Sequence, residues 1–324
     1  LVSQGAVQLK PGDALQATSY VLVSYDSLGK CPIKIPQTEF RGITLQQLQL
    51  ILDFINVHAH LWVETFSGSP DFEQPLDPDT FNLYHTCTWI IAPSTFRFKC
   101  SMVELVAADA AAQFPKWFCS HAWREAVRRF VSCLRQHAYL RNAGDCAYWI
   151  CAYANNQHKL QEDIAANPRS TSFYKAMKLS LGVVLILDKD ATPFERIWCC
   201  FEESIAVEER NSGTPLLLDV AATDSSNQAY VITDGLAAAE ARQMPLLGFL
   251  AKSLREVNFP TLLAQKGLDV DISKANASQA DDKKRILNCI RLPHARTKEL
   301  ADLAPPQHSN YAAVNEALAA HFAD

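Results

Sequence analysis

The sequence predicts an α/β protein with a doubly wound parallel sheet. The first observation is the apolar run 182–188, which is typical of a strand buried on both faces. The second is the helical spacing of apolar residues in 195–210, directly after that strand. The third is that the same order occurs earlier, with a short strand at 116–121 and a helix at 124–140. Strands that alternate with helices indicate parallel pairing with helical crossovers.

Weaker signals continue this alternation to the end of the chain. Further strands are expected at 147–154, 215–220, 230–233 and, at an edge of the sheet, 268–272. Further helices are expected at 172–180, 236–256, 281–290 and 311–322. Pro245 interrupts the second of these helices.

The first 112 residues have a different pattern. Strands are expected at 19–24 and 88–91, and Thr44 is expected to cap a helix that runs to about Val57. Residues 67–82 contain several prolines and acidic residues and are expected to form a loop. We therefore divide the chain into an N-terminal α/β extension, 1–112, and a larger α/β domain, 113–324. Periodicity leaves open whether the extension is a domain of its own or packs on the larger one.

Composition excludes several classes of function. The net charge of −5 gives no electrostatic reason to expect binding to nucleic acid or an acidic membrane. No apolar run approaches the ~20 residues that a membrane-spanning helix needs. The ten cysteines lie mostly in apolar patterns without a Cys-x-x-Cys pair, which favours a reducing, cytoplasmic or nuclear location. Because the chain begins at Leu1, a removed targeting segment stays an open alternative.

Three common enzyme motifs are missing from the sequence. It contains neither Gly-x-Gly-x-x-Gly nor Gly-x-x-x-x-Gly-Lys-Ser/Thr, which disfavours a dinucleotide-dependent dehydrogenase and a P-loop nucleotidase. It also lacks Gly-x-Ser-x-Gly, the nucleophile elbow of α/β-hydrolases.

Two Trp-containing segments carry a family resemblance. With Trp117-Phe-Cys-Ser-His-Ala-Trp123, the strand 182–188 and Trp198-Cys-Cys-Phe-Glu202, the chain resembles the Toll/interleukin-1 receptor homology (TIR) domain. The resemblance covers 113–220 well and 221–324 poorly, and it implies a flavodoxin-like sheet of five parallel strands. The chain is also similar to a group of algal proteins with Ser-His-x-Trp and Arg-Ile-Trp-Cys elements, which implies no function.

The resemblance implies a catalytic glutamate. Some TIR domains cleave NAD at the nicotinamide–ribose bond with the glutamate of this helix, which corresponds to Glu202. A carboxylate suits that reaction because bond breaking builds positive charge on the ribose. NAD would be a substrate, and no cofactor is implied. Helix geometry places Glu202 beside Trp198, off the apolar stripe, and predicts that Glu203 faces solvent.

The other residues that would bind NAD are expected in the turn after the strand 116–121, in the loop after the strand 147–154 and on the helix 195–210. Trp123 could stack on a nucleobase or on the nicotinamide ring. The candidate binding residues are Ser120, His121, Trp123, Arg124, Asn155, Asn156, Gln157, His158 and Trp198. A zinc site of Cys119, His121 and Cys151 is conceivable but lacks an evident fourth ligand, so no metal is expected.

Three functions stay open from the sequence. The first is an NAD glycohydrolase that acts through Glu202 and is activated by self-association. The second is a non-catalytic signalling module that binds other TIR-like domains through its sheet edges and the loop 155–170. The third is a nucleotide-binding relative that does not cleave NAD. In the second case Glu202 is a surface carboxylate paired with a neighbour such as Arg196.

Overall fold

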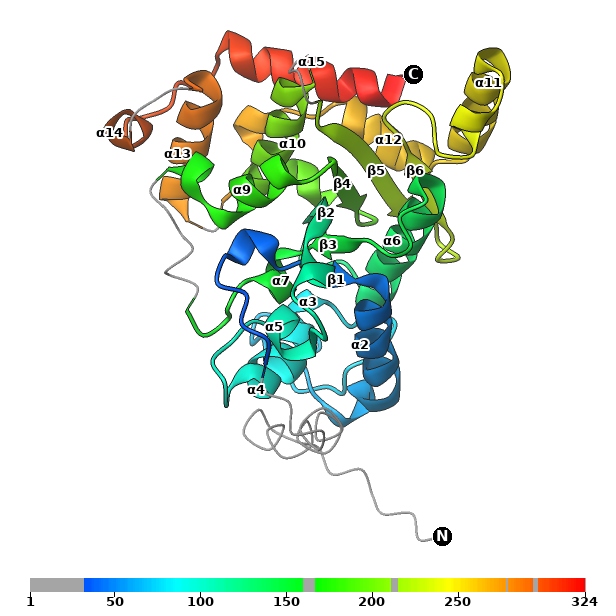
Figure 1. The fold of residues 1–324 in the computed structure, drawn as a ribbon. Coiled ribbons are helices and arrows are strands. Elements are labelled where there is room, and N and C mark those ends of the chain that lie inside the picture. Colours follow the sequence, from blue (N-terminus) through cyan, green and yellow to red (C-terminus); the bar gives the residue numbers. More distant parts are fainter. Residues whose placement is uncertain (1–31, 160–166, 211–214, 278, 294–296, 324) are drawn as a thin grey trace, which may run out of the picture.

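A six-stranded mixed sheet lies at the centre of the computed structural model, which describes residues 32–159, 167–210, 215–277, 279–293 and 297–323 (Figure 1). The strands are β1 (Ile43–Thr44), β2 (Pro115–His121), β3 (Ala147–Trp149), β4 (Gly182–Leu187), β5 (Leu217–Thr223) and β6 (Ala229–Ile232). Their order is β1-β3-β2-β4-β5-β6. The four central strands are parallel, whereas β1 and β6 are antiparallel to their neighbours. The predicted α/β class is confirmed, with a mixed sheet.

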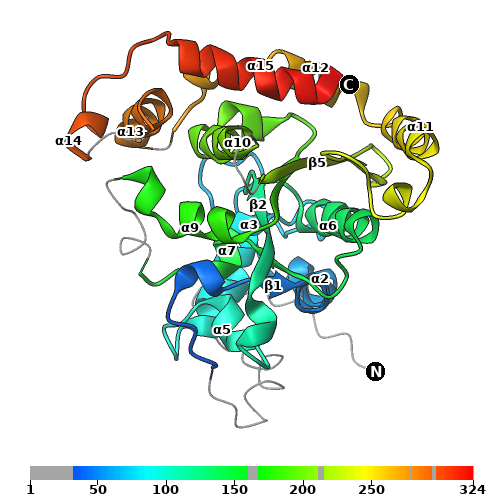
Figure 2. The ribbon, with the colours of Figure 1, turned by 45° about the horizontal axis from the view of Figure 1, so that its top comes forward.

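Helices cover both faces of the sheet (Figures 1 and 2). The longer ones are α2 (Leu45–His58), α6 (Val127–Arg141), α9 (Ser172–Leu179), α10 (Ile197–Glu209), α11 (Pro245–Glu256), α12 (Thr261–Leu268), α13 (Ala280–Arg291) and α15 (Ser309–Ala323). The short ones are α3 (Leu83–Thr86), α4 (Ala92–Thr95), α5 (Met102–Val106), α7 (Cys151–Ala154) and α14 (Thr297–Leu300). Among the described residues, none of these helices is long and apolar enough to cross a membrane.

The burial of β4 on both faces explains why this strand gives the clearest strand signal in the sequence. Successive side chains of a strand point to opposite faces, and both faces of β4 are covered. Val184 and Ile186 belong to the core that includes α2 and α6, whereas Val183, Leu185 and Leu187 belong to the core that includes α9, α10 and α13. All these side chains are buried, so β4 reads as a continuous apolar run.

The N-terminal region contributes a strand to the same sheet. Ile43 of β1 pairs with Tyr148 of β3. The next helix, α2, begins where the sequence predicts it: the Thr44 hydroxyl accepts a hydrogen bond from the Gln47 backbone N–H, and the Gln47 side chain accepts one from the Thr44 N–H. Side chains of α2 and of β2 to β6 share one core.

Three predicted strands differ from the structure. The first two are short apolar runs, which sequence cannot assign to helix or strand, and the third is the alternating segment 268–272. The strand expected at 147–154 ends at Trp149, and the helix α7 follows it. The strand expected at 88–91 is a π-helical turn, Cys87–Ile91. In place of an edge strand at 268–272, α12 runs to Leu268 and the 3₁₀ turn Ile272–Lys274 follows. The strand expected at 19–24 lies outside the described residues.

Candidate functional site

The predicted catalytic helix α10 starts beside the carboxyl ends of β2 and β4. The helix that follows β2, α6, belongs to one core, and the helix that follows β4, α10, belongs to the other. The direction of winding therefore reverses between these neighbouring strands. Open α/β sheets hold their ligands at such a point.

Glu202 lies in this region but is almost closed off from solvent. Its residue surface is 5% exposed, and the Ser120 hydroxyl and the Arg196 guanidinium lie near its carboxyl group. Burial raises the pKa of Glu202 to about 8, although both neighbours act to lower it. Ser120 Oγ forms no hydrogen bond of standard geometry within the described chain. Glu202 is thus mainly a neutral acid at pH 7.

The imidazole and thiol groups around Glu202 are also uncharged. Burial lowers the pKa of His121 to about 4, so its ring is neutral. Burial raises the thiol pKa values of Cys119, Cys151 and Cys199, and the Glu202 carboxyl adds to each rise. Such thiols behave as small apolar groups rather than nucleophiles. Within the described residues, no three His, Cys, Asp or Glu side chains are placed to hold a metal ion.

Arg196 and two aromatic rings border this cluster. The pKa of Arg196 is raised: its burial opposes the rise, but contacts with Cys199 and the Tyr84 hydroxyl outweigh it. Trp123 Nε1 donates a hydrogen bond to Cys151 Sγ at 3.2 Å, and its ring packs against Tyr84 with centroids 5.3 Å apart. The next predicted residue, Arg124, is exposed. The Trp123 ring, which was predicted to stack on a ligand, therefore packs against the ring of Tyr84.

The loop after β3 contacts the N-terminal region. Asn156 Nδ2 donates to the Lys99 carbonyl at 2.6 Å. His158 Nε2 lies 2.9 Å from Thr95 Oγ1, and its ring is edge-on to Phe96. These contacts join the loop to the end of α4.

The remaining predicted binding residues are Asn155 and Gln157 of this loop and Trp198 of α10, and none of them contacts Lys99, Thr95 or Phe96 in the way that Asn156 and His158 do. Asn155 is buried with an unpartnered Oδ1 in the described chain, and Gln157 Nε2 donates to the Ala152 carbonyl at 2.9 Å. Trp198 Nε1 donates to Asp282 Oδ2 of α13 at 3.1 Å. A surface cavity of about 280 Å³ adjoins this contact and is lined by Arg196, Ile197, Trp198, Asn276, Ala277 and Asp282. Of the predicted site residues, the structure places Ser120 directly beside Glu202.

The prediction that Glu203 faces solvent is wrong. Glu203 is fully buried, neither carboxyl oxygen has a hydrogen-bond partner in the described chain, and burial raises its pKa well above the usual value. The reason is that α10 packs on the sheet on one side and on α13 and α15 on the other. The turn of α10 that carries Glu203 therefore has no solvent side, which a single apolar stripe does not reveal.

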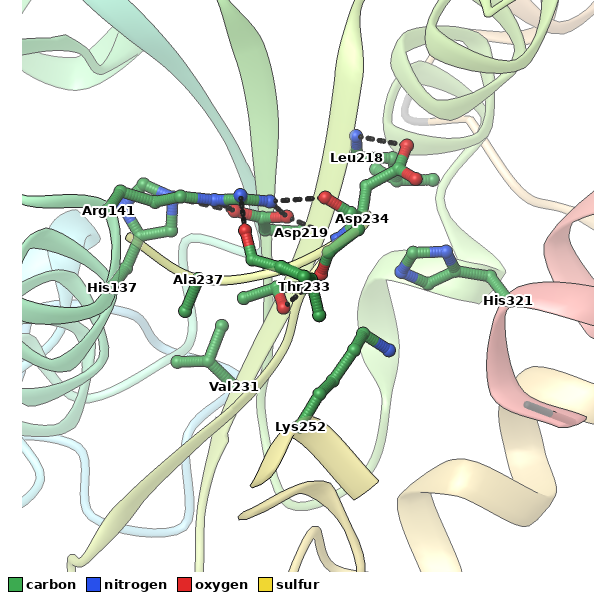
Figure 3. Close-up of polar contacts among 12 residues, drawn as sticks. His137, Arg141, Leu218, Asp219, Val231, Thr233, Asp234, Ala237, Lys252 and His321 are labelled. Carbon is green, nitrogen blue, oxygen red and sulfur yellow. Dashed lines mark hydrogen bonds and ion pairs between the residues drawn. The ribbon is translucent and has the colours of Figure 1, made fainter. Parts of the chain in front are cut away.

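A second polar cluster lies around Asp219 in the middle of β5 (Figure 3). Asp219 is fully buried, and its carboxylate accepts hydrogen bonds from Nε and Nη2 of Arg141 at 2.7 and 2.5 Å. His137 Nε2 lies 3.0 Å from Asp219 Oδ2, and His137 Nδ1 lies 3.0 Å from the Tyr148 hydroxyl. Burial acts to raise the pKa of Asp219, but the bonds from His137 and Arg141 outweigh it and lower that pKa.

The Asp219 cluster also holds the segment that leads from β6 to α11. Arg141 Nη2 donates to the Asp234 carbonyl at 2.8 Å, and its Nη1 donates to the Leu236 carbonyl at 3.1 Å (Figure 3). The Asp234 N–H donates to Asp219 Oδ1 at 2.8 Å. Because these groups satisfy one another and Asp219 is out of solvent, the cluster has a structural role.

The helix α11 turns its charged face toward the protein. Arg255 Nε donates to Glu240 Oε1 at 2.8 Å, and its Nη1 donates to the Val231 carbonyl of β6 at 2.5 Å. Glu256 Oε1 accepts from the Thr233 N–H at 2.7 Å. An edge strand leaves backbone groups unpaired, and polar side chains of α11 supply partners at and just after β6.

The opposite face of α11 is apolar and exposed. At ~100° per residue, one broad stripe of α11 and of Val257 directly after it contains six large apolar side chains whose residues are between 50% and 80% exposed. We call these residues the outer face: Leu246, Leu247, Phe249, Leu250, Leu254 and Val257. A contiguous exposed apolar surface of this kind marks interaction sites in folded proteins. The sequence predicts a helix in this region, but it does not show which face of the helix packs on the protein and which faces solvent.

Comparison with protein-family models, with curated proteins and with solved structures finds no match. Two places in the molecule therefore carry the functional argument: the Glu202 cluster and the outer face of α11.

Proposed function

We propose that this protein is a protein–protein interaction module on an α/β fold, and that the outer face of α11 is its binding surface. The observation that carries the proposal is that α11 exposes its apolar side chains while Arg255 and Glu256 bind the rest of the protein. Burying one such side chain fully is worth about 1.5–3 kcal/mol. A partner that covers the outer face therefore gains a large apolar contribution.

The arrangement of the sheet supports a TIR-like signalling module. The parallel strands follow the order β3-β2-β4-β5, which is the order of the first four strands in a flavodoxin-like sheet. The antiparallel β6 occupies the place of a fifth parallel strand. Since α11 covers the β6 edge, we assign binding to the helix rather than to that sheet edge.

Site-specific photo-crosslinking in living cells tests this proposal. A photoreactive amino acid replaces Leu250 on the outer face or, as a control, Tyr139 of α6, which is 79% exposed. We expect a covalent protein adduct from position 250 and none from position 139, because only the outer face binds a partner. Absence of an adduct at 250, or equal adducts at both positions, would contradict the proposal.

A second candidate function is cleavage of the nicotinamide–ribose bond of NAD by Glu202. It is favoured by the position of the Glu202 carboxyl beside Ser120 and Arg196, at the end of β2. The carboxylate form would stabilise positive charge on the ribose. Because the pKa of Glu202 is raised to about 8, turnover should increase as pH rises from about 7 to about 9.

Nicotinamide release by the full chain tests this second function. The variant is Glu202→Gln, and Glu195→Gln is the control because Glu195 is exposed just before α10. We expect release by wild type and the control, and a rate roughly 100-fold lower for Glu202→Gln. NAD binding without release would favour a nucleotide-binding relative, and release that persists in Glu202→Gln would exclude Glu202 as the catalytic residue.

A further inference from the structure

We infer that the partner of α11 is a second copy of this chain, joined by a two-fold pairing of the two outer faces. The inference rests on the proposed function, since it names the partner of the same surface.

The first argument is the spacing of the outer-face residues. Leu247, Leu250, Leu254 and Val257 follow one another at intervals of three, four and three residues. These are the a and d positions of a heptad, the spacing with which identical helices pack knobs into holes. All four residues are at least 50% exposed, so the seam is unoccupied by the rest of the described chain.

The second argument is the size of the surface. The six outer-face residues expose roughly 700 Å² in all, if a fully exposed large apolar residue has about 180 Å² of surface. Each partner of a stable complex buries about 800 Å². The outer face of one helix against the same face of another therefore provides most of the area that a dimer needs.

The third argument is the distribution of charge. Helices that bind lipid surfaces carry Lys and Arg on a polar face directed at the headgroups. In α11, Lys252 is paired with Glu256 at 2.5 Å and Arg255 with Glu240 at 2.8 Å, and the outer face carries no charge. An uncharged face meets its own copy without like-charge repulsion, and the net charge of −5 opposes an anionic membrane.

The fourth argument is the place of α11 in the molecule. Figures 1 and 2 show α11 at the periphery, beyond the β5–β6 side of the sheet, with no other described helix or strand on the side away from the sheet. A symmetric contact uses the same patch on both copies, so it needs one protruding element and no second surface. The outer face of α11 meets that condition.

Sedimentation of the full chain from about 1 to about 100 µM tests the inference, because dimerisation depends on concentration. We expect wild type to form a dimer and the double variant Leu250→Glu/Leu254→Glu to associate roughly 100-fold more weakly or worse, because four carboxylates would enter the apolar seam. The control Leu303→Glu changes a residue that is 86% exposed and lies outside α11, and should dimerise like wild type. All these positions are exposed, so thermal unfolding should change little.

The outcomes separate the inference from the proposed function. A monomeric wild type at the highest concentration, or a double variant that dimerises as wild type does, overturns the dimer. If wild type is monomeric but the crosslinker at Leu250 captures another protein, the dimer fails and the interaction module stands. If wild type is monomeric and instead co-sediments with anionic phospholipid vesicles without any protein adduct, both fail.

Discussion

Asp219 and Glu203 are both fully buried carboxyl groups, but they are buried in opposite protonation states. Asp219 stays ionised because Arg141 and His137 bind it. Glu203 has no hydrogen-bond partner in the described chain, so it stays protonated. The first group ties α6 to β5, and the second is a latent source of pH sensitivity in α10.

Replacing Asp219 with Asn should lower the free energy of unfolding by about 3–5 kcal/mol at pH 7, because Arg141 would stay buried without its anion. The folded-state pKa of Asp219 lies below the unfolded value of 3.8, so its stabilisation is present above pH 3.8 and is lost as pH falls further. Urea unfolding of both proteins across pH measures the difference. A cost of less than about 1 kcal/mol at pH 7 would refute the structural role of the cluster.

Replacing Glu203 with Gln should stabilise the protein progressively as pH rises. The folded-state pKa of Glu203 lies above the unfolded value of 4.5, so its stabilisation is complete below pH 4.5 and is lost as pH rises toward the folded pKa. Gln resembles the protonated acid and does not ionise. Relative to wild type, the variant should gain about 1.4 kcal/mol per pH unit above 4.5. Parallel pH profiles in urea unfolding, like those expected for the exposed control Glu195→Gln, would contradict this.

At the level of single residues, the sequence could predict identity but not environment. The motif singled out Glu202, and the structure does place Ser120 beside it. The burial of Glu203 could not be predicted, because it depends on α13 and α15, which pack on α10 from far along the chain. Likewise, the partners of Asn156 and His158 come from residues 95–99, which no local pattern connects to them.

Among the elements, α11 and β6 determine each other's orientation. The edge of β6 offers backbone groups that need polar partners, and Arg255 and Glu256 provide them. This contact turns the charged side of α11 inward, and the apolar stripe then faces solvent. The exposed face is therefore a consequence of closing the sheet edge.

Replacing Arg255 with Met should loosen α11 from the sheet. Met keeps an apolar stem of similar length but removes the hydrogen bonds to Glu240 and the Val231 carbonyl. We expect a loss of about 1–3 kcal/mol and faster amide hydrogen exchange in α11. Lys252→Met is the matched control, because Lys252 pairs with Glu256 of the same helix. Equal exchange in the two variants would show that Arg255 does not hold the helix.

Element boundaries were predictable where a periodic signal was long or capped. The strand β4 and the helices α2 and α10 agree with the sequence pattern to within a few residues. The predicted strand 147–154 extends too far because the apolar run continues through α7, where Ala152, Tyr153 and Ala154 are buried. The antiparallel direction of β6 follows from its short connection to β5, residues 224–228, which is too short for the crossover that a parallel pair needs.

For the whole molecule, the alternation of strands and helices was enough to predict the α/β class. It was not enough to predict that β1, from the N-terminal region, joins the same sheet beside β3. That pairing spans about a hundred residues and depends on tertiary packing. The same limit explains why the outer face of α11 was not foreseen: whether a helix stripe is covered depends on every other element.

Side-chain footprinting by hydroxyl radicals on the full chain tests the central claim, that the outer face of α11 is an exposed binding surface. In dilute protein, we expect Phe249 and Leu250 to be oxidised about as readily as their exposure predicts, and buried Phe201 to be protected. On binding, Phe249 and Leu250 should become protected while Tyr139 stays reactive. Protection of Phe249 and Leu250 even in dilute protein, or no change when complexes form, would contradict the account.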